Sequence, residues 1–284
     1  YNLSNISLVI LLALIINLSS LDTIYLFNES YLIDNLSNYM KIILVGSGIF
    51  VMLTGSKYIQ VINLNKIEYP ILILSSILGM MIMISSNDLI VFYMGLELQS
   101  LALYVLASFN RDNLLSTESG LKYFVLSALS SGLLLYGCSL TYGFSESTNF
   151  DQILINSTEF NYGTTFGIVF ILVGLAFKIS AVPFHMWAPD VYQGSPTSVT
   201  LFFAILPKIA ALSVFIKFLY TPFANMNDQW QTIIVFISIA SMIFGAVAAI
   251  GQKNLKRLIA YSSISHMGYC LLYTSDAADE WLRG

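Results

Sequence analysis

Three ionisable residues, Glu97, Lys178 and Lys208, lie deep inside stretches of the sequence that are otherwise apolar. A charged lysine at the centre of a membrane helix costs about 2.5–3.5 kcal/mol on insertion scales, so it normally has a partner or a water-filled path. A carboxylate and an ammonium hold each other charged where the dielectric constant is low, and separating them favours the neutral amine. We therefore interpret Glu97 and Lys178 as a pair that holds and releases a proton, with Lys208 next on the path. The alternative is a static ion pair that fixes helix packing.

A proline accompanies each of the two lysines. Pro183 follows Lys178, and Pro207 directly precedes Lys208. Proline has no N–H and clashes with the preceding turn, so it kinks or breaks a helix. Broken helices inside membranes occur where they are buried in protein or line a cavity. The pairing of proline with a buried lysine, found twice, predicts a functional helix break at each position, whereas an isolated proline would indicate only a structural kink.

Both histidines of the chain could pass protons near neutral pH. His185 lies in the same segment as Pro183, and it could equally be an interfacial histidine beside Trp187, an aromatic anchor. We expect His266, in a serine-rich stretch, to face the helix bundle, where a packing role is the alternative to a relay role. The serine and glycine run 127–132 would permit close helix contact, and we assign it no chemistry.

The composition places the chain among membrane proteins. Hydrophobic residues make up 57% of the 284 residues and charged residues only 10%, and the mean hydropathy is +0.77. A soluble domain has a more polar composition than this. A membrane helix needs about 20 apolar residues, and the sequence contains nine such stretches. We therefore predict an all-α, polytopic membrane protein with about nine transmembrane helices, at residues 3–20, 41–62, 69–86, 88–109, 119–143, 164–187, 197–220, 230–251 and 255–272.

The charges between these spans segregate by side when the spans alternate in direction. Loops rich in lysine and arginine stay on the inner side of a membrane. One side carries most of the basic residues, namely Lys57, Lys66, Arg111, Lys253, Lys256 and Arg257. The other side carries the acidic loops, with Lys41 and Lys217 near its helix ends. We therefore place Tyr1, Arg111 and Lys256 on the inner face, where Lys256 and Arg257 would be simple anchors.

The two ends of the chain differ from the rest. The sequence begins without Met and enters the first span almost at once, so we expect the natural N-terminus to be missing. From residue 270 the apolar pattern gives way to a stretch that is similar to translated adapter sequence from a sequencing library. We therefore predict a non-native tail over 270–284 and a transmembrane domain over 1–269, whose natural C-terminal continuation we also expect to be missing.

Several of these segments resemble one known family, the antiporter-like membrane subunits of respiratory complex I and the related multi-subunit sodium/proton antiporters. Within that family the chain is most similar to the subunit 2 group. The matching segments are Gly95–Tyr104, Gly120–Phe124, Phe177–Thr197, Leu206–Lys208 and Gln252–Ser263. The resemblance implies that Glu97 pairs with Lys178 on a broken helix, and that Lys208 continues the proton path. It also implies an antiporter-like fold and a later lysine, beyond this chain, that completes the path.

The resemblance implies a role in an enzyme that passes electrons from NADH to ubiquinone and moves protons outwards. The chain has no glycine-rich dinucleotide fingerprint and no cysteine set for an iron–sulfur cluster. We therefore expect no cofactor and no metal in this chain, and NADH, FMN, iron–sulfur clusters and ubiquinone in partner subunits. The expected partners are the other complex I membrane subunits and the lipid bilayer, with no nucleic acid.

Residue usage typical of A+T-rich organellar genomes predicts the mitochondrial inner membrane, with Tyr1 on the matrix side. A sodium/proton antiporter subunit and a structural scaffold are the alternatives.

Overall fold

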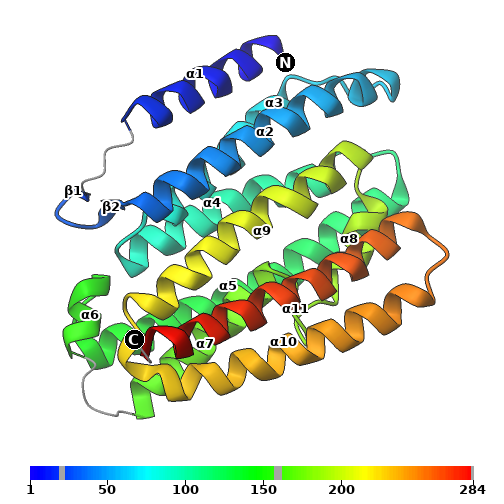
Figure 1. The fold of residues 1–284 in the computed structure, drawn as a ribbon. Helices are drawn as coiled ribbons and strands as arrows, with labels where there is room; N and C mark the ends of the chain where they lie inside the picture. Colours follow the sequence, from blue (N-terminus) through cyan, green and yellow to red (C-terminus); the bar gives the residue numbers. More distant parts are fainter. Residues whose placement is uncertain (19–22, 157–161, 283–284) are drawn as a thin grey trace. The chain divides into compact units, whose positions relative to one another are not determined.

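The computed structural model describes residues 1–18, 23–156 and 162–282, and they form an almost entirely helical protein (Figure 1). The only sheet in the described part is a short antiparallel hairpin in which Tyr25 pairs with Leu32. In chain order the elements are α1 (Asn2–Leu18), β1 (Ile24–Leu26), β2 (Tyr31–Ile33), α2 (Asn35–Val61), α3 (Glu68–Ser85), α4 (Leu89–Ala107), α5 (Leu114–Ser145), α6 (Phe150–Asn156), α7 (Tyr162–Lys178), α8 (Trp187–Gly194), α9 (Thr197–Tyr220), the 3-10 turn η1 (Ala224–Met226), α10 (Asn227–Ile250) and α11 (Leu255–Leu282).

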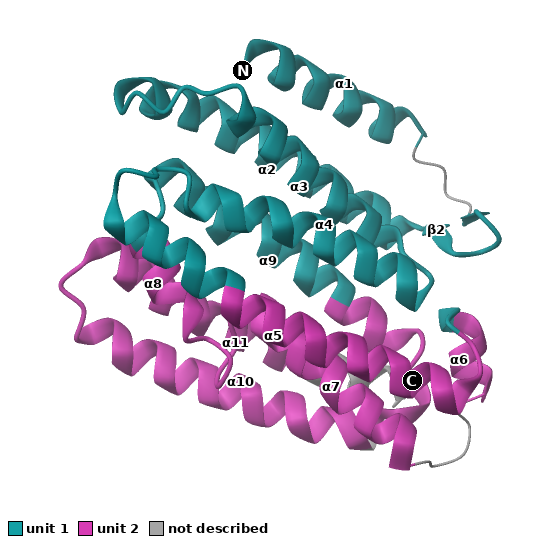
Figure 2. Cartoon of the chain, turned by 180° about the vertical axis from the view of Figure 1, so that it is seen from behind, with its two compact units in different colours: residues 1–124, 148–150, 194–214 teal, residues 125–147, 151–193, 215–284 magenta. Residues whose placement is uncertain are grey.

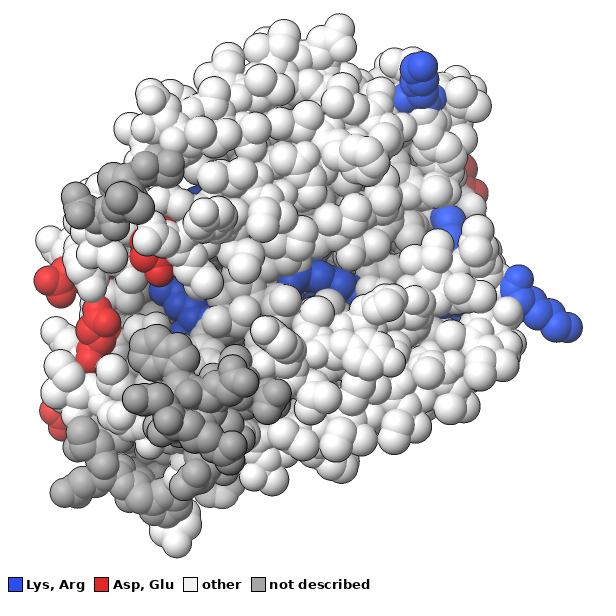
Figure 3. Space-filling model, viewed as in Figure 1, with Lys and Arg blue, Asp and Glu red and all other residues white. Residues whose placement is uncertain are grey.

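Each of the nine predicted spans corresponds to a helix. Six of them, α2, α3, α4, α5, α9 and α10, are long and apolar enough to cross a membrane, and α1 and α7 are shorter apolar helices. Helices suit this environment because they satisfy their backbone hydrogen bonds internally. Figure 3 shows a face of the molecule on which charged side chains are sparse. The predicted class, an all-α polytopic membrane protein, is confirmed.

The chain divides into two compact units (Figure 2). Unit 1 comprises residues 1–124, 148–150 and 194–214, and unit 2 comprises residues 125–147, 151–193 and 215–284. Helices α5 and α9 each contribute residues to both units. The predicted tail over 270–284 belongs to unit 2, where α11 continues to Leu282. Its side chains from residue 275 onwards lie outside the described residues, and the predicted tail boundary stays a prediction.

Glycine allows close contact between helices in both units. In unit 1, Gly95 of α4 lies against α3, and a Cβ atom at this position would meet the backbone nitrogen of Met83 at 2.8 Å. In unit 2, a Cβ atom at Gly268 of α11 would meet the nitrogen of Met242 in α10 at 2.9 Å. Small residues drive such packing because lipid supplies no hydrophobic force between helices. By contrast, Gly132, in the run predicted to permit close contact, has no neighbouring atom within 4 Å of a Cβ position.

The structure of unit 1 supports the prediction that successive spans alternate in direction across the membrane. Lys66, before α3, and Arg111, after α4, line the same cavity. At the other ends of these helices, the Asn87 side chain donates a hydrogen bond to the Glu29 carbonyl oxygen at 3.2 Å, and the Thr148 hydroxyl donates one to Asp88. Asp88 also caps α4 by accepting from its first backbone N–H groups. Basic and acidic connections therefore lie at opposite ends of α3 and α4.

Candidate functional site

Lys178 is the last residue of α7 and is only 5% exposed. Its ammonium group donates a hydrogen bond to the Ser127 hydroxyl of α5, with 2.8 Å between Nζ and Oγ. The C-terminal end of a helix carries the negative end of its dipole, which favours a positive charge there. A hydroxyl both accepts and donates hydrogen bonds. Ser127, to which the sequence analysis assigned no chemistry, therefore extends the hydrogen-bonding path of Lys178.

Helix α7 ends directly after Lys178, as predicted. The N–H of Ala181 donates to the carbonyl of Ala176 at 2.9 Å, and the N–H of Ser180 donates to Phe177 at 3.0 Å. Ser180 has a φ of 58°, in the left-handed region. These features form a Schellman motif, which ends a helix by giving its last carbonyls new donors. Pro183 lies two residues beyond the motif, where its missing N–H and fixed φ prevent the helix from continuing. The helix break at Pro183 is confirmed.

The segment between α7 and α8 is held by side chains as well as by its backbone. The backbone N–H of Val182 donates to the Ser241 hydroxyl of α10 at 2.9 Å. The indole N–H of Trp187 donates to the Phe177 carbonyl at 2.9 Å, and the two rings stack with centroids 5.6 Å apart. Polar backbone groups freed at a break inside a membrane need such partners. Trp187 is buried, so in this unit it braces the break rather than serving as an exposed anchor.

The two histidines of unit 2 have different environments. His185 lies in the α7–α8 segment, half-buried, with its ring centroid 4.5 Å from that of Phe244 in α10. His266 lies on α11, and its side chain is exposed. The prediction that His266 faces the bundle is therefore wrong. Its neighbours Ser265 and Met267 occupy the buried positions of this turn instead. Helix α11 has no distinct polar face, so its hydropathy does not identify the side that packs.

Lys208 and Glu97 both belong to unit 1. Lys208 lies within α9 and is 5% exposed. Glu97 lies on α4 and is half-buried, and its Oε1 atom is buried without a hydrogen-bond partner among the described residues. The side-chain oxygen of Gln99 on the same helix is in the same state. Buried acceptors nearly always have a donor, so this part of α4 presents two oxygens that can accept one.

The second predicted helix break does not occur. Helix α9 runs from Thr197 to Tyr220 with Pro207 inside it. Proline removes one backbone hydrogen bond, but its neighbours Phe203, Leu206 and Ala210 are fully buried. Their packing on both sides of Pro207 keeps the helix intact. Lys208 therefore lies in the interior of a continuous helix, unlike Lys178, which lies at a helix end.

The predicted contact between Glu97 and Lys178 joins residues of different units, and it stays a prediction. Each unit contains one residue of the predicted pair. Unit 2 provides a buried ammonium group at a helix end, bonded to Ser127. Unit 1 provides a carboxylate oxygen that is buried and has no hydrogen-bond partner in the described part of the chain.

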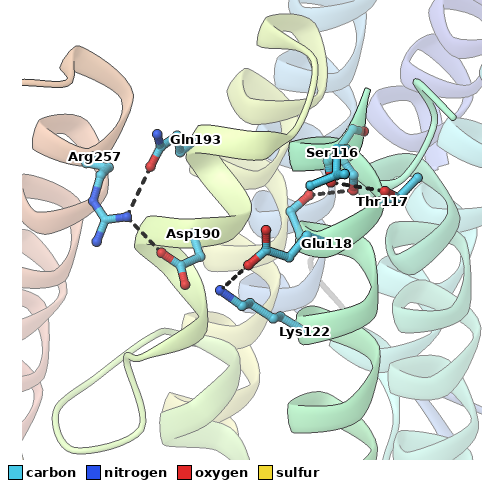
Figure 4. A network of polar contacts seen from close by, with 9 residues as sticks. Ser116, Thr117, Glu118, Lys122, Asp190, Gln193 and Arg257 are labelled. Atoms are coloured by element: carbon cyan, nitrogen blue, oxygen red, sulfur yellow. Dashed lines mark hydrogen bonds and ion pairs between the residues drawn. The ribbon is translucent and has the colours of Figure 1, made fainter. Parts of the chain in front are cut away.

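Helix α8, which follows the break, is tied to α11 by a polar network in unit 2 (Figure 4). The Arg257 guanidinium donates to the Asp190 carboxylate at 2.8 Å and to the side-chain oxygen of Gln193 at 3.0 Å. Arg257 was predicted to be a simple inner-face anchor, and this ion pair corrects that interpretation. The sequence offered no signal for the pair, because Asp190 and Arg257 are far apart along the chain. In unit 1, the other ion pair drawn in Figure 4 joins Glu118 and Lys122 of α5 at 2.8 Å.

Two further lysines are buried, although the sequence predicts them only as ordinary basic residues near helix ends. Lys41 of α2 is 5% exposed, and its ammonium lies 3.2 Å from the Tyr31 hydroxyl and 5.0 Å from the centre of that ring. Lys217 of α9 is equally buried. The available signal was the position of each lysine inside an apolar helix, where a charged side chain requires a partner.

Comparisons with known proteins agree with this architecture. A family model described as "NADH:quinone oxidoreductase/Mrp antiporter, TM" matches residues 86–280. NADH-quinone oxidoreductase subunit N of Pelagibacter ubique is 69% identical, over 100% of this chain and 60% of that protein. The chain therefore spans well under two thirds of the length of this curated relative.

Solved structures with the same fold include chains from different membrane complexes. A chain of respiratory complex I from Thermus thermophilus, solved with bound aureothin, is 31% identical with a TM-score of 0.80, covering 95% of this chain and 57% of that one. A chain of the Mrp complex from Dietzia sp. has a TM-score of 0.79 at 21% identity, covering 96% of this chain and 52% of that one. The second likeness concerns the fold alone.

Proposed function

The chain belongs to the transmembrane family of NADH:quinone oxidoreductases and Mrp antiporters, and on this premise we propose that it translocates protons as a subunit of an NADH:quinone oxidoreductase. The observation that carries the proposal is the placement of Lys178. Its amine is buried at the broken end of α7 and bonded to a hydroxyl from another helix. Broken helices with free ends inside the membrane are typical of ion-binding sites in transporters.

In the proposed mechanism, Lys178 holds a proton while a carboxylate is near, and Glu97 is the carboxylate that the sequence predicts for this role. When that partner moves away, burial disfavours the ammonium form, and the proton leaves through the hydroxyl of Ser127. Lys208 is the next acceptor, since it is a second buried amine. His185 is a candidate relay at the break, because it lies on the segment that joins α7 to α8. His266, being exposed, is not assigned a role within the chain.

The electron chemistry is assigned to other subunits in this proposal. NADH, FMN, iron–sulfur clusters and the quinone would be bound there, and the other membrane subunits of the complex would be the partners of this chain. Electron transfer would act on this subunit through conformational or electrostatic change. The 69% identity to a protein named as subunit N of such an enzyme supports the assignment. The antiporter alternative has less support, since the Mrp likeness is at 21% identity.

The proposal also concerns the kind of membrane that contains the chain. Curated relatives such as those of Pelagibacter and Rhodospirillum are bacterial, so they give the predicted mitochondrial inner membrane no support. We propose the bacterial plasma membrane instead. The predicted orientation, with Tyr1 and the basic loops on the inner side, then refers to the cytoplasmic face.

The test is Lys178→Met in the full-length subunit, expressed in its own organism within the assembled complex. Methionine fills a similar volume but cannot carry a proton. We expect the complex to assemble on a native gel, while NADH-driven acidification of membrane vesicles falls to background. The control is Lys57→Met, because Lys57 is an exposed lysine of α2. That variant should pump protons like the parent.

Three results would separate the alternatives. If Lys178→Met prevented assembly while Lys178→Arg, which keeps the charge but cannot release a proton, restored both assembly and pumping, the lysine would have a scaffold role only. If proton movement in the parent required a sodium gradient and no NADH, the antiporter assignment would replace the proposed one. Normal NADH-driven acidification by an assembled Lys178→Met complex would refute the proposed role of Lys178.

A further inference from the structure

A cavity of about 340 Å³ opens at one end of unit 1, between the segment before α3, the end of α4 and the start of α5. Its lining combines basic, hydroxyl and apolar side chains, with one carboxylate. The lining residues are Lys66, Glu68, Leu72, Val105, Ser108, Phe109, Arg111 and Thr117. This mixture differs from the mostly apolar surface of the spans, and it suits a ligand that is itself both charged and apolar.

The charge in the cavity is unbalanced. Lys66 and Arg111 both contribute to the lining, against the single carboxylate of Glu68. Neither cation forms an ion pair within the part of the chain that the structure describes. Two like charges at a common cavity repel each other, and a shared anion removes this cost. Arginine and lysine are also the side chains that bind phosphate groups, through forked and point-charge contacts respectively.

An exposed apolar stripe leads from the cavity along α4. Val105 lines the cavity, and Leu101, Leu98 and Met94 follow it on the same face at intervals of three or four residues, all exposed. At 1.5 Å per residue, the stripe from Val105 to Met94 is about 16 Å long. One leaflet of a hydrocarbon core about 30 Å thick has nearly this depth. The stripe is therefore long enough to hold one acyl chain from its glycerol end to the bilayer midplane.

We propose that this cavity binds an anionic phospholipid, with its phosphate between Lys66 and Arg111 and one acyl chain along the α4 stripe. Basic pockets between membrane helices on the cytoplasmic side bind anionic lipid headgroups in other proteins. The predicted orientation places Lys66 and Arg111 on that side, where anionic lipids attract basic residues. The lipid site is independent of the proposed proton path, since neither cation is part of it.

The test measures phosphatidylglycerol binding to the assembled complex in nanodiscs, with phosphatidylcholine as the zwitterionic reference. The variants are Lys66→Gln, Arg111→Gln and the double variant, and Lys57→Gln is the control because its exposed cation lies outside the cavity lining. A basic residue near an anionic surface contributes about 1 kcal/mol. We therefore expect phosphatidylglycerol affinity to fall about fivefold in each single variant and about thirtyfold in the double variant, with no change in the control.

Further arms distinguish a lipid from other sources of phosphate. An excess of inorganic phosphate, or of glycerophosphoglycerol without acyl chains, should not displace phosphatidylglycerol from the parent complex. Displacement by either would overturn the lipid assignment in favour of a free phosphate site. Unchanged phosphatidylglycerol affinity in the assembled double variant would overturn the site itself. If the double variant did not assemble, the charge-conserving pair Lys66→Arg and Arg111→Lys must retain the preference for phosphatidylglycerol, and its loss there would overturn the proposal.

Discussion

The contact between α3 and α4 leaves no room for a side chain at Gly95, and Gly95→Ala tests how strictly unit 1 depends on it. A Cβ atom at Gly95 would lie 2.8 Å from the nitrogen of Met83 and 2.9 Å from the carbonyl oxygen of Gly79. Both atoms belong to the backbone of α3, and a backbone atom within a helix cannot move aside unless the helix itself shifts. Ordinary contact begins at 3.4 Å, so the two helices must separate by about 0.6 Å over this stretch.

The expected cost follows from this overlap. Overpacking of a well-packed interior costs about 1–3 kcal/mol of unfolding free energy. Alanine also has a higher helix propensity than glycine, by about 1 kcal/mol, and this gain would hide part of the cost. Gly46→Ala is the matched control, because Gly46 lies within α2 and has no atom within 4 Å of a Cβ position. Since the propensity gain is common to both variants, their difference measures the overpacking cost alone.

The assay is thermal unfolding of the purified assembled complex, followed for this subunit by the exposure of its buried cysteine, Cys138, to a thiol reagent. At about 2–4 °C per kcal/mol, the Gly95→Ala transition should lie about 2–12 °C below that of Gly46→Ala. Because Gly95 precedes Glu97 by two residues, proton pumping should fall as well. Equal transition temperatures for the two variants would refute the close packing of α3 on α4 at this position.

Three further predictions concern unit 2. Ser127→Ala removes the hydroxyl bonded to Lys178, so pumping should fall while NADH oxidation in uncoupled membranes is retained, and an unchanged proton-to-electron ratio would contradict this. Asp190→Ala and Arg257→Ala should each destabilise the complex by up to about 1 kcal/mol, as expected for a partly exposed ion pair. The exchanged pair Asp190→Arg with Arg257→Asp should recover most of the loss in thermal unfolding, and additive losses would exclude the pairing. Trp187→Phe keeps the ring stack but loses the indole hydrogen bond, which should cost about 1 kcal/mol and be measurable as a lower transition temperature.

The helical spans could be predicted because their signal is local. A run of about 20 apolar residues has only one way of burying its backbone polar groups in a bilayer. The stop of α7 after Lys178 was predictable for a similar reason, since Pro183 limits the backbone within a few residues of itself. A proline does not always end a helix. Pro207 lies inside α9, because the packing of Phe203 and Leu206 outweighs the one missing hydrogen bond.

The burial of particular side chains was harder to predict. His266 was expected to face the bundle and is exposed, whereas Lys41 was expected to be an ordinary basic residue near a helix end and is buried. In a soluble helix, a polar face identifies the side that meets water. Neither α2 nor α11 has a distinct polar face, so their hydropathy does not reveal which side packs against protein.

The sequence by itself determined the class of the protein, the positions of its membrane helices and the presence of Glu97, Lys178 and Lys208 within them. These follow from composition and from the free energy of placing apolar and charged groups in a bilayer, which depend on residue type and local order. Only the tertiary structure decided which polar side chains contact one another. Ser127 contacts Lys178 across a separation of 51 residues, and Asp190 contacts Arg257 across a separation of 67 residues. Such contacts depend on how helices rotate and cross, and local sequence carries no direct record of that geometry.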